Sequence, residues 1–316
     1  MTTPVFLTVD VALRRSLHAA GLERDAVIER SFEPAGVGLS WQIAMLARHD
    51  LKGCFFVDPL PALVFGLDPI RRVVDTILDA GQEVQLRLDP AWGGAVAGDD
   101  GATHGRFALS DYAVAAQHDL IAGARELLVA AGAPAPLAFR AHRHAANDAT
   151  LDALAALGFA YDTSRNGGER DDAITLPSRQ IAPVAHGGVV ELPVTLIEEQ
   201  GAALRPFDLS SLSAGEICAA LDHAEACHHA AVTIVSAADM LANQAATRPN
   251  AIHVGRFTTL CATLGERRDT LPTCWFGDRP ALRLGQNDRP LAPHRLRSGW
   301  RQAEQLWSHL VEERAA

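Results

Sequence analysis

The sequence predicts an α/β fold in which a parallel β-sheet closes into a barrel. Three observations indicate this class. Short apolar runs that suit buried strands recur along the 316-residue chain, amphipathic stretches that suit helices lie between them, and no sharp change in composition appears before Gly285. Strands that alternate with helices form parallel sheets, because each helix returns the chain to the edge where the next strand begins. Seven or eight such strands close a barrel, whereas fewer leave the sheet open.

The predicted strands are apolar runs of the kind that is buried on both faces of a parallel sheet. The first covers residues 5–9. The run at 84–88 alternates apolar and polar residues, which places Arg87 and the following Asp89 on the same face. Pro90 ends this strand because proline has no N–H group to pair in a sheet. Further strands are predicted at residues 54–57, 137–139, 159–161, 189–193, 232–235 and 272–276.

The predicted helices lie between these strands. Asp68 and Pro69 form a suitable N-cap and first-turn pair before residues 70–78, where apolar residues repeat at a spacing of three to four. Asn147 is a candidate N-cap for residues 147–157, and Gly158 is the candidate stop. Other helices are predicted at residues 110–131, 214–228, 252–267 and 295–314. We expect a barrel domain of residues 1–284 and a C-terminal extension of residues 285–316, whose terminal helix packs outside.

Composition narrows the classes of function. The formal net charge of −10 argues against non-specific binding to nucleic acid or to an anionic membrane surface. The sequence begins without a basic and apolar leader, and it contains no run of about 18 apolar residues. We therefore expect a cytoplasmic protein with neither a nucleic acid nor a membrane as partner. Assembly into a homo-oligomer stays open at this point.

The cysteines and one pair of histidines are candidate metal ligands. The five cysteines are odd in number and none shows CxxC spacing, which argues against a disulfide framework or a zinc site made of cysteines. His228 and His229 follow a predicted helix and precede an apolar strand. We interpret this pair as a helix C-terminal cap favoured by the helix dipole, with a ligand role as the alternative.

Charged residues recur at the predicted carboxyl ends of strands, where parallel α/β barrels carry their chemistry. Asp10 ends the first strand, and Arg87 and Asp89 end the third. Arg140 ends the fourth strand, and two histidines follow it closely. Any α/β protein has some polar residues where strands meet loops, but here charges of both signs converge on one rim. The rim is therefore the predicted functional site.

Four segments resemble the polysaccharide deacetylases, the carbohydrate esterases with a NodB homology domain. LTVD at 7–10 is similar to the family's Thr-Phe-Asp-Asp motif, and AGQEVQLR at 80–87 is similar to Ala-Gly-His-Glu-Val-x-x-His. FRAHRHAANDATLDALAALGFAYDTS at 139–164 resembles the arginine-containing third motif, and VVELPV at 189–194 resembles the fourth. The order and spacing agree over residues 4–280. The resemblance implies the family's distorted (β/α) barrel.

The resemblance also implies a chemistry, which is the metal-dependent removal of acetyl groups from sugars. A divalent cation held by one carboxylate and two histidines polarises the acetyl carbonyl and acidifies a water molecule. A further carboxylate takes the proton of that water, an arginine orients this carboxylate, and a late histidine protonates the leaving amine. Asp10 matches the general base and Arg140 matches the orienting arginine. These two residues form the expected catalytic pair.

The sequence departs from the family pattern at the metal ligands and at the acid. Val11 stands at the second aspartate, Arg87 stands at the first metal histidine, and no histidine follows Asp89 closely. The segment Ser236-Ala237-Ala238 offers no acid histidine. We therefore expect a divergent member of the family with no metal cofactor. A base alone supplies about 10²–10⁴-fold in rate, a small part of what amide hydrolysis requires.

Three interpretations of the site remain open. In the first, the permanent charge of Arg87 replaces the cation, pairs with Asp10 or Asp89, and leaves a pseudo-deacetylase that binds a glycan or an acylated ligand. In the second, His142 and His144 join Asp89 or Asp10 in a rebuilt site for zinc or another divalent metal, since their i, i+2 spacing shares one face of an extended loop.

In the third, Asp10 acts with Arg140 and Arg87 as a metal-free hydrolase. An active protein would hydrolyse C–N or ester bonds of acetylated sugars, and the sequence does not decide whether the chain is an enzyme. Trp92 follows the third strand and is a candidate platform for sugar stacking, with packing under the loop as the alternative. The residues expected to bind the ligand are Arg87, Asp89, Trp92, His142 and His144.

Overall fold

The centre of the molecule is an eight-stranded sheet. The computed structural model describes residues 2–94, 107–169, 172–201 and 203–312. The strand order is β10-β1-β2-β3-β4-β5-β7-β6, and all neighbours pair in parallel except the antiparallel pair of β6 and β7. The strands are β1 Val5–Val11, β2 Cys54–Val57, β3 Glu83–Leu88, β4 Ala138–Ala141, β5 Tyr161–Asp162, β6 Val184–His186, β7 Val189–Glu191 and β10 Val232–Ala237.

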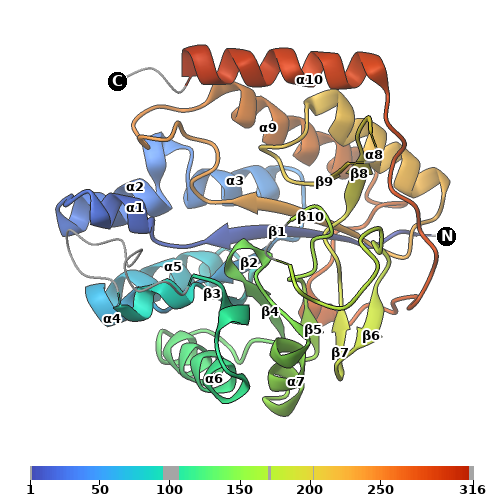
Figure 1. Cartoon of the computed structure of the whole chain (residues 1–316). Coiled ribbons are helices and arrows are strands. Elements are labelled where there is room, and N and C mark those ends of the chain that lie inside the picture. Colours follow the sequence, from blue (N-terminus) through green and yellow to red (C-terminus); the bar gives the residue numbers. More distant parts are fainter. Residues whose placement is uncertain (1, 95–106, 170–171, 202, 313–316) are drawn as a thin grey trace.

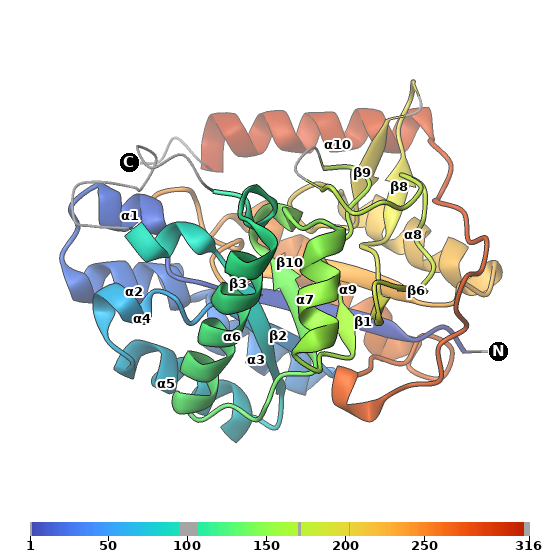
Figure 2. The ribbon, with the colours of Figure 1, turned by 60° about the horizontal axis from the view of Figure 1, so that its bottom comes forward.

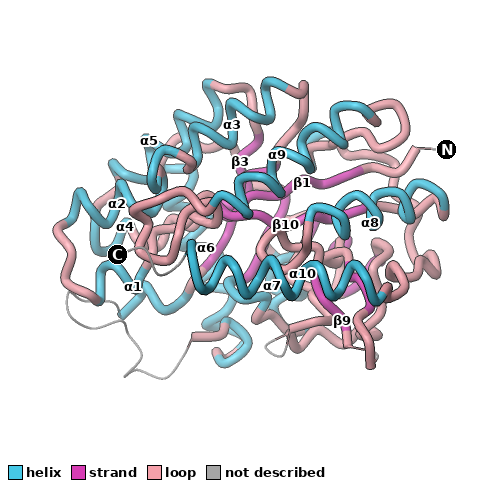
Figure 3. The backbone as a smooth tube through the Cα atoms, turned by 90° about the horizontal axis from the view of Figure 1, so that it is seen from above, coloured by secondary structure: helices cyan, strands magenta, loops and turns pink. Residues whose placement is uncertain are grey.

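Helices surround this sheet, with the strands at the centre of the molecule (Figures 1 and 3). None of the helices in the described ranges combines the length and the apolar character that a membrane crossing requires. The α-helices are α1 Arg15–Ala19, α2 Arg24–Phe32, α3 Leu39–Arg48, α4 Ala62–Phe65, α5 Asp68–Asp79, α6 Val114–Ala130, α7 Asp148–Ala156, α8 Ala214–Ala226, α9 Ala251–Glu266 and α10 Arg295–Trp307.

The barrel is distorted where β10 and β6 form the two edges of the sheet. Segments that follow β7 lie along β10 instead of a regular strand. The N–H of Thr195 donates to the carbonyl of Thr233 (3.1 Å), and the N–H of Val235 donates to the carbonyl of Phe207 (2.9 Å). Between these contacts, β8 (Leu196–Glu198) and β9 (Leu204–Pro206) form a separate antiparallel hairpin beside α8 and α10 (Figure 2).

The core forms because the strands are apolar on both faces. Every residue of β2 is buried, and in β1 only Asp10 is partly exposed. Phe276 packs against Phe6 with ring centroids 4.8 Å apart and against Phe56 at 5.8 Å. The burial of each such side chain stabilises the folded state by about 1.5–3 kcal/mol relative to leaving it exposed. This burial fixes the strands and thereby the positions of the charged residues at their ends.

The α/β class and the first seven predicted strands are confirmed, but the eighth is wrong. In the predicted strand at 272–276, Thr273 makes a single bridge to Val5, and a 3-10 turn follows at Phe276–Asp278. The apolar residues of this run do not extend the sheet, and Phe276 instead packs against Phe6 and Phe56. The helices α1 to α4 and the strands β6, β8 and β9 were not predicted.

The helix caps give mixed results. Asn147 caps α7 as predicted, because its side chain accepts from the N–H of Thr150. Asp68 is not a cap, since it lies inside the first turn of α5 and pairs with Arg71 at 3.0 Å. At the other end of the chain, α10 is tied to the barrel by ion pairs, such as Arg256 Nη2 to Glu304 Oε2 at 2.9 Å. The division into a barrel and an extension stays a prediction.

Candidate functional site

Charged side chains from four neighbouring strands meet at the carboxyl edge of the sheet. The parallel register places Arg87 of β3 beside Arg140 of β4, and Asp10 of β1 beside Phe56 of β2. Asp58 follows β2 directly. Residues in register on adjacent strands are only about 5 Å apart, so their long side chains reach one another across the edge. The structure thus gathers the residues that the sequence placed on one rim.

Arg140, whose side chain is buried, holds one oxygen of Asp10. The Arg140 Nη1 lies 2.8 Å from Asp10 Oδ1 and 2.8 Å from Thr8 Oγ1, and its Nη2 donates to Thr163 Oγ1 at 3.1 Å. The guanidinium also lies over the ring of Phe56, 4.5 Å from the centroid. Arg140 is only 1% exposed. Several fixed partners therefore set the direction from which Arg140 orients Asp10.

Arg87 bridges Asp10 and a second carboxylate. Its Nε lies 3.3 Å from Asp10 Oδ2, and its Nη1 lies 3.4 Å from Asp58 Oδ2. Burial of the guanidinium acts to lower the pKa of Arg87, but the carboxylates of Asp10, Asp58 and Asp89 outweigh burial and raise it. Arg87 is therefore charged at every accessible pH. Asp10 is one of the two partners that we expected for this arginine.

Asp58 is a member of the cluster that sequence reasoning missed. Its side chain is fully buried and accepts from the N–H of Leu60 at 3.2 Å. Burial raises the pKa of Asp58 to about 8, opposed by the charge of Arg87 and reinforced by that of Asp89. The sequence did contain a signal for Asp58, because this residue directly follows the predicted strand at 54–57, and the other site residues also lie at the ends of predicted strands.

His142 lies between Arg87 and Asp89. Arg87 Nη2 contacts His142 Nδ1, and His142 Nε2 lies 3.5 Å from Asp89 Oδ2. Since a guanidinium can only donate, Nδ1 accepts and Nε2 carries the hydrogen toward Asp89. Burial, followed by the charges of Arg87 and Arg15, lowers the pKa of His142 to about 2, so the ring is neutral. Arg15 Nη1 completes the surroundings of Asp89 at 3.4 Å.

The loop after β4, which carries His142 and His144, is a tight turn. Arg143 and His144 both adopt left-handed backbone conformations, with φ of +55° and +59°. Such a conformation costs a non-glycine residue about 1–2 kcal/mol, and strain of this kind concentrates at functional sites. His144 Nδ1 is buried and has no hydrogen-bond partner among the described residues. Burial and the charge of Arg140 lower the pKa of His144 to about 4.

The rebuilt metal site of the second interpretation is not formed. It required an extended loop, whereas residues 142–144 form a 3-10 turn with a kink at Arg143. Within the described ranges, the side chains of Asp10, Asp89, His142 and His144 do not bring three ligand atoms within 4.8 Å of one another. The i, i+2 argument was wrong because it applies only to extended backbone.

Trp92 is also placed differently from the sugar-stacking expectation. The ring is 1% exposed and packs against Phe65 and His18, with centroid distances of 5.9 Å and 6.0 Å. A buried ring offers no face to a sugar. The alternative, packing under the loop, describes its position, because an indole gains more from burial among apolar neighbours than from exposure at a strand end.

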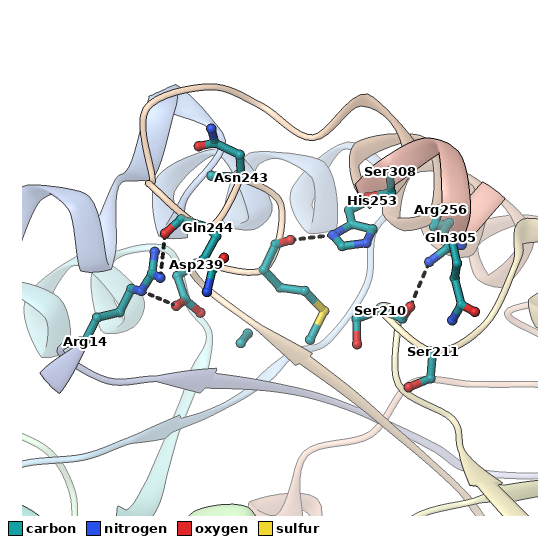
Figure 4. A pocket seen from close by; sticks show the side chains of 13 residues that line it. Arg14, Ser210, Ser211, Asp239, Asn243, Gln244, His253, Arg256, Gln305 and Ser308 are labelled. Carbon is teal, nitrogen blue, oxygen red and sulfur yellow. Dashed lines mark hydrogen bonds and ion pairs between the residues drawn. The ribbon is translucent and has the colours of Figure 1, made fainter. Parts of the chain in front are cut away.

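A cavity of about 610 Å³, lined by both polar and apolar side chains, adjoins the cluster on the β10 side (Figure 4). Ala237, the register partner of Asp10, is one of the residues that line it. At one side Arg14 Nε lies 3.4 Å from Asp239 Oδ2, and at the other Arg256 Nη1 donates to the carbonyl of Ser210. Further residues that line the cavity are Ser211, Asn243, Gln244, His253, Gln305 and Ser308.

The similarity of this chain to known proteins is found in solved structures. No protein-family model matches the sequence, and no curated protein matches it. A solved structure from Mycobacterium smegmatis, described as a polysaccharide deacetylase, superposes with a TM-score of 0.58 at 17% identity, over 91% of this chain and 95% of its own. The chain has the polysaccharide deacetylase fold.

Two other solved structures also superpose on this chain. A 4-alpha-glucanotransferase from Thermococcus litoralis superposes with a TM-score of 0.53 at 8% identity, and the match covers 88% of this chain and 40% of the transferase. A family 4 carbohydrate esterase from Streptomyces lividans, in complex with acetate, gives a TM-score of 0.46 at 13% identity, over 92% of this chain and 98% of its own. Because deacetylase and glucanotransferase share the fold, the chemistry has to be argued from the site.

Proposed function

We propose that this protein is a divergent polysaccharide deacetylase-like protein that binds a glycan or an acylated ligand without a metal ion. The observation that carries the proposal is the place of the Arg87 guanidinium, which contacts Asp10 at 3.3 Å and Asp58 at 3.4 Å. The family pattern has a metal-binding histidine at position 87. An arginine there supplies a permanent charge and hydrogen-bond donors to carboxylates that would otherwise need a cation.

The residues at this edge do not fit the divalent cation of the deacetylases. Both oxygens of Asp10 already accept from guanidinium groups, one from Arg87 and one from Arg140. Both ring nitrogens of His142 face Arg87 or Asp89. A metal cation in this space would be repelled by the two buried guanidinium groups that are already there. We therefore derive no step that depends on a metal here.

The cavity beside the cluster supports a hydroxylated ligand. Its volume of about 610 Å³ lies in the range of small-molecule sites, about 300–1,000 Å³. Charged, hydroxyl and amide side chains line it, and such groups both donate and accept hydrogen bonds as sugar hydroxyls do. Two solved structures with this fold are named for activities on carbohydrates, which also supports a glycan ligand.

Asp239 favours a second candidate function, a metal-free hydrolase. It stands near the end of β10, where the family pattern expects the acid histidine. Burial raises the pKa of Asp239, and the charge of Arg14 opposes that shift. A carboxyl group that keeps its proton can act as a general acid, with Asp10 in the role of the base. The two engaged oxygens of Asp10 make this candidate weaker than ligand binding.

Calorimetric titration with N-acetylated chitooligosaccharides tests the proposal, with acetate release measured on the same samples. We expect one-to-one binding with no acetate released, both with and without a chelator. The Asp239→Asn variant should weaken binding by about 10-fold or more, because hydrogen bonds to charged groups contribute about 1.5–3 kcal/mol. Asp25→Asn is the matched control, since that carboxylate is exposed on α2, with 93% of its side chain accessible.

Other outcomes separate the alternatives. Release of acetate that a chelator abolishes would contradict the proposal and return the protein to the metal-dependent enzymes. Release of acetate that a chelator does not affect would support the second candidate. If no acetylated glycan bound at all, the ligand class proposed for the cavity would be wrong.

A further inference from the structure

A second group of ligand-type side chains lies at the opposite end of the sheet from Asp10 and Arg87. His223 is in the last turn of α8, Cys227 is the C-cap of that helix, and His229 follows shortly before β10 begins. The carbonyl of His229 accepts from Thr3 Oγ1 at 3.0 Å, just ahead of β1. This group therefore sits at the amino edge of the sheet, where barrels of this type carry stability rather than catalysis.

The end of α8 explains why the three residues meet. The N–H of His229 donates to the carbonyl of Ala224 (2.9 Å), and the N–H of His228 donates to that of Glu225 (3.1 Å). These two bonds form a Schellman motif, with His228 left-handed at φ +51°. The motif folds the following residue back onto the last turn, where an apolar contact is usual. Here the contact joins two imidazoles, His223 and His229, with centroids 5.1 Å apart.

One pair of ligand atoms has the separation that a tetrahedral ion requires, and the third ligand atom lies near both. His223 Nδ1 lies 3.6 Å from Cys227 Sγ, and a ligand nitrogen of His229 lies within 4.8 Å of the other two ligand atoms. Bonds of about 2.3 Å from zinc to sulfur and about 2.0–2.1 Å to nitrogen place a sulfur and a nitrogen about 3.6 Å apart at the tetrahedral angle. The observed distance agrees with this value.

The surroundings of the two histidines point to a ligand. His223 Nε2 lies 2.9 Å from the carbonyl of Arg289, which fixes the hydrogen there and leaves the lone pair of Nδ1 toward Cys227. A metal-bound histidine almost always has such an outer partner. His229 is 2% exposed, and in the described part of the chain its ring meets the backbone of Arg289 at a geometry poorer than that of an ordinary hydrogen bond. A buried polar group that is poorly hydrogen-bonded costs up to about 1–3 kcal/mol, which a metal ion would offset.

We propose that His223, Cys227 and His229 form a structural site for a zinc-type metal ion, with the fourth position open to water. Thiolate and imidazole ligands suit zinc and related borderline ions. The exposed thiol of Cys227 provides the entry path. Arg283 places a positive charge near His229, which the carboxylate of Asp288 offsets. The ion would join the end of α8 to the start of β10, independently of the ligand proposed for the carboxyl edge.

Titration of the full-length, reduced protein with Co²⁺ tests this site. We expect one equivalent to bind with a thiolate-to-cobalt charge-transfer absorption, Zn²⁺ to displace it, and the unfolding temperature to rise with metal. Cys227→Ser should abolish the absorption and weaken binding by at least about 100-fold, since the loss of an outer partner alone costs about 10–100-fold. Because Cys227 is exposed, this variant should keep its fold.

Cys218→Ser is the matched control, because Cys218 lies on the same helix and contacts Thr263 instead of a histidine. It should bind cobalt as the unaltered protein does. His229→Gln should remove one equivalent of cobalt without affecting the binding of an acetylated glycan. The proposal is overturned if the unaltered protein shows no charge-transfer absorption, or if the absorption persists in Cys227→Ser.

Discussion

Arg87 shows how one substitution changes what a rim of carboxylates can bind. Its guanidinium lies between Asp10 and Asp58, where a histidine would have offered a neutral ligand nitrogen. A histidine at this position would offer a ligand nitrogen to a bound cation, whereas an arginine itself supplies the positive charge. The same carboxylates that could hold a metal thus become partners of a fixed side chain.

The Arg87→Ala substitution should lower the free energy of unfolding, relative to the unaltered protein, by more at pH 9 than at pH 6. Asp58 has a raised pKa of about 8, so its carboxyl group holds a proton at pH 6 and loses it by pH 9. The loss of the pair with Asp10 applies at both values of pH, whereas the loss of the pair with Asp58 appears only as Asp58 ionises, at up to about 1.4 kcal/mol per pH unit above its pKa. Urea denaturation at both values of pH measures the difference.

Arg71→Ala is the control for that comparison. Arg71 pairs with Asp68 on the exposed face of α5, with 49% and 82% of the two side chains accessible. Exposed pairs of this kind contribute about 0–1 kcal/mol, so the control should lose little stability at either pH. An equal loss for Arg87→Ala at pH 6 and pH 9 would show that Asp58 does not depend on this arginine.

His144 should make the protein less stable as the pH falls. Its pKa is lowered to about 4 in the folded state, below the ordinary value of 6.5. Between about pH 6.5 and pH 4 the unfolded chain binds a proton that the folded chain does not, so this group reduces stability by up to about 1.4 kcal/mol per pH unit as the pH falls. Thermal or urea unfolding across this range should show that slope.

The His144→Asn variant should flatten this dependence and leave stability above pH 7 less affected. Asparagine tolerates the left-handed backbone at this position and does not titrate. His118→Asn is the matched control, because that ring is 43% exposed on α6. A slope that is unchanged in His144→Asn would mean that another group carries the acid sensitivity.

At the scale of elements, the turn at residues 142–144 and the helix after it act together. The turn is strained at two residues, and α7 begins four residues after His144. Asn147 and Thr150 form a capping box, in which the side chain of each residue accepts a hydrogen bond from the backbone N–H of the other. This cap fixes the end of the loop that positions His142.

The Asn147→Ala variant should lose about 1 kcal/mol of stability and also weaken glycan binding. The loss of stability follows from the orphaned N–H groups at the start of α7. Ser213→Ala is a comparison for stability alone, because Ser213 forms the same kind of capping box at α8 but lies two residues from Ser211, which lines the cavity. It should lose similar stability, as measured by denaturation. If Asn147→Ala bound the glycan as tightly as the unaltered protein in calorimetry, α7 would have no role at the site.

Short elements were the part of the fold that the sequence did not predict. In α2 the buried residues Val27, Ile28 and Phe32 follow a helical spacing, but the helix has only nine residues and no side-chain cap. The strand predicted at 272–276 contains the apolar residues of a strand, yet Phe276 is used in a core of aromatic rings. A pattern of one or two periods cannot distinguish these cases, because tertiary packing decides them.

At the scale of the molecule, the two ends of the sheet have different characters. The carboxyl edge carries buried arginines and aspartates beside a cavity, while the amino edge carries His223, Cys227 and His229. The overall charge of −10 describes neither end. A fold that also occurs in a glucanotransferase can keep its strands while the residues at their ends change.

The sequence by itself determined the α/β class, the places of the central strands along the chain and the positions of Asp10, Arg87 and Arg140 at strand ends. These features follow from local patterns, since the period of a strand and the residue at its end are properties of consecutive residues. The departure of Arg87 from the family pattern was visible in the same way. The sequence therefore identified where the site lies and which residue alters it.

Only the tertiary structure decided how these residues meet. It paired Arg87 with Asp10 and Asp58, placed His142 and His144 in a 3-10 turn instead of an extended loop, and buried Trp92. It also brought His229 back onto His223 through a left-handed residue at 228. The direction of each side chain in a loop depends on backbone angles that packing between distant segments selects, and no local pattern contains that information.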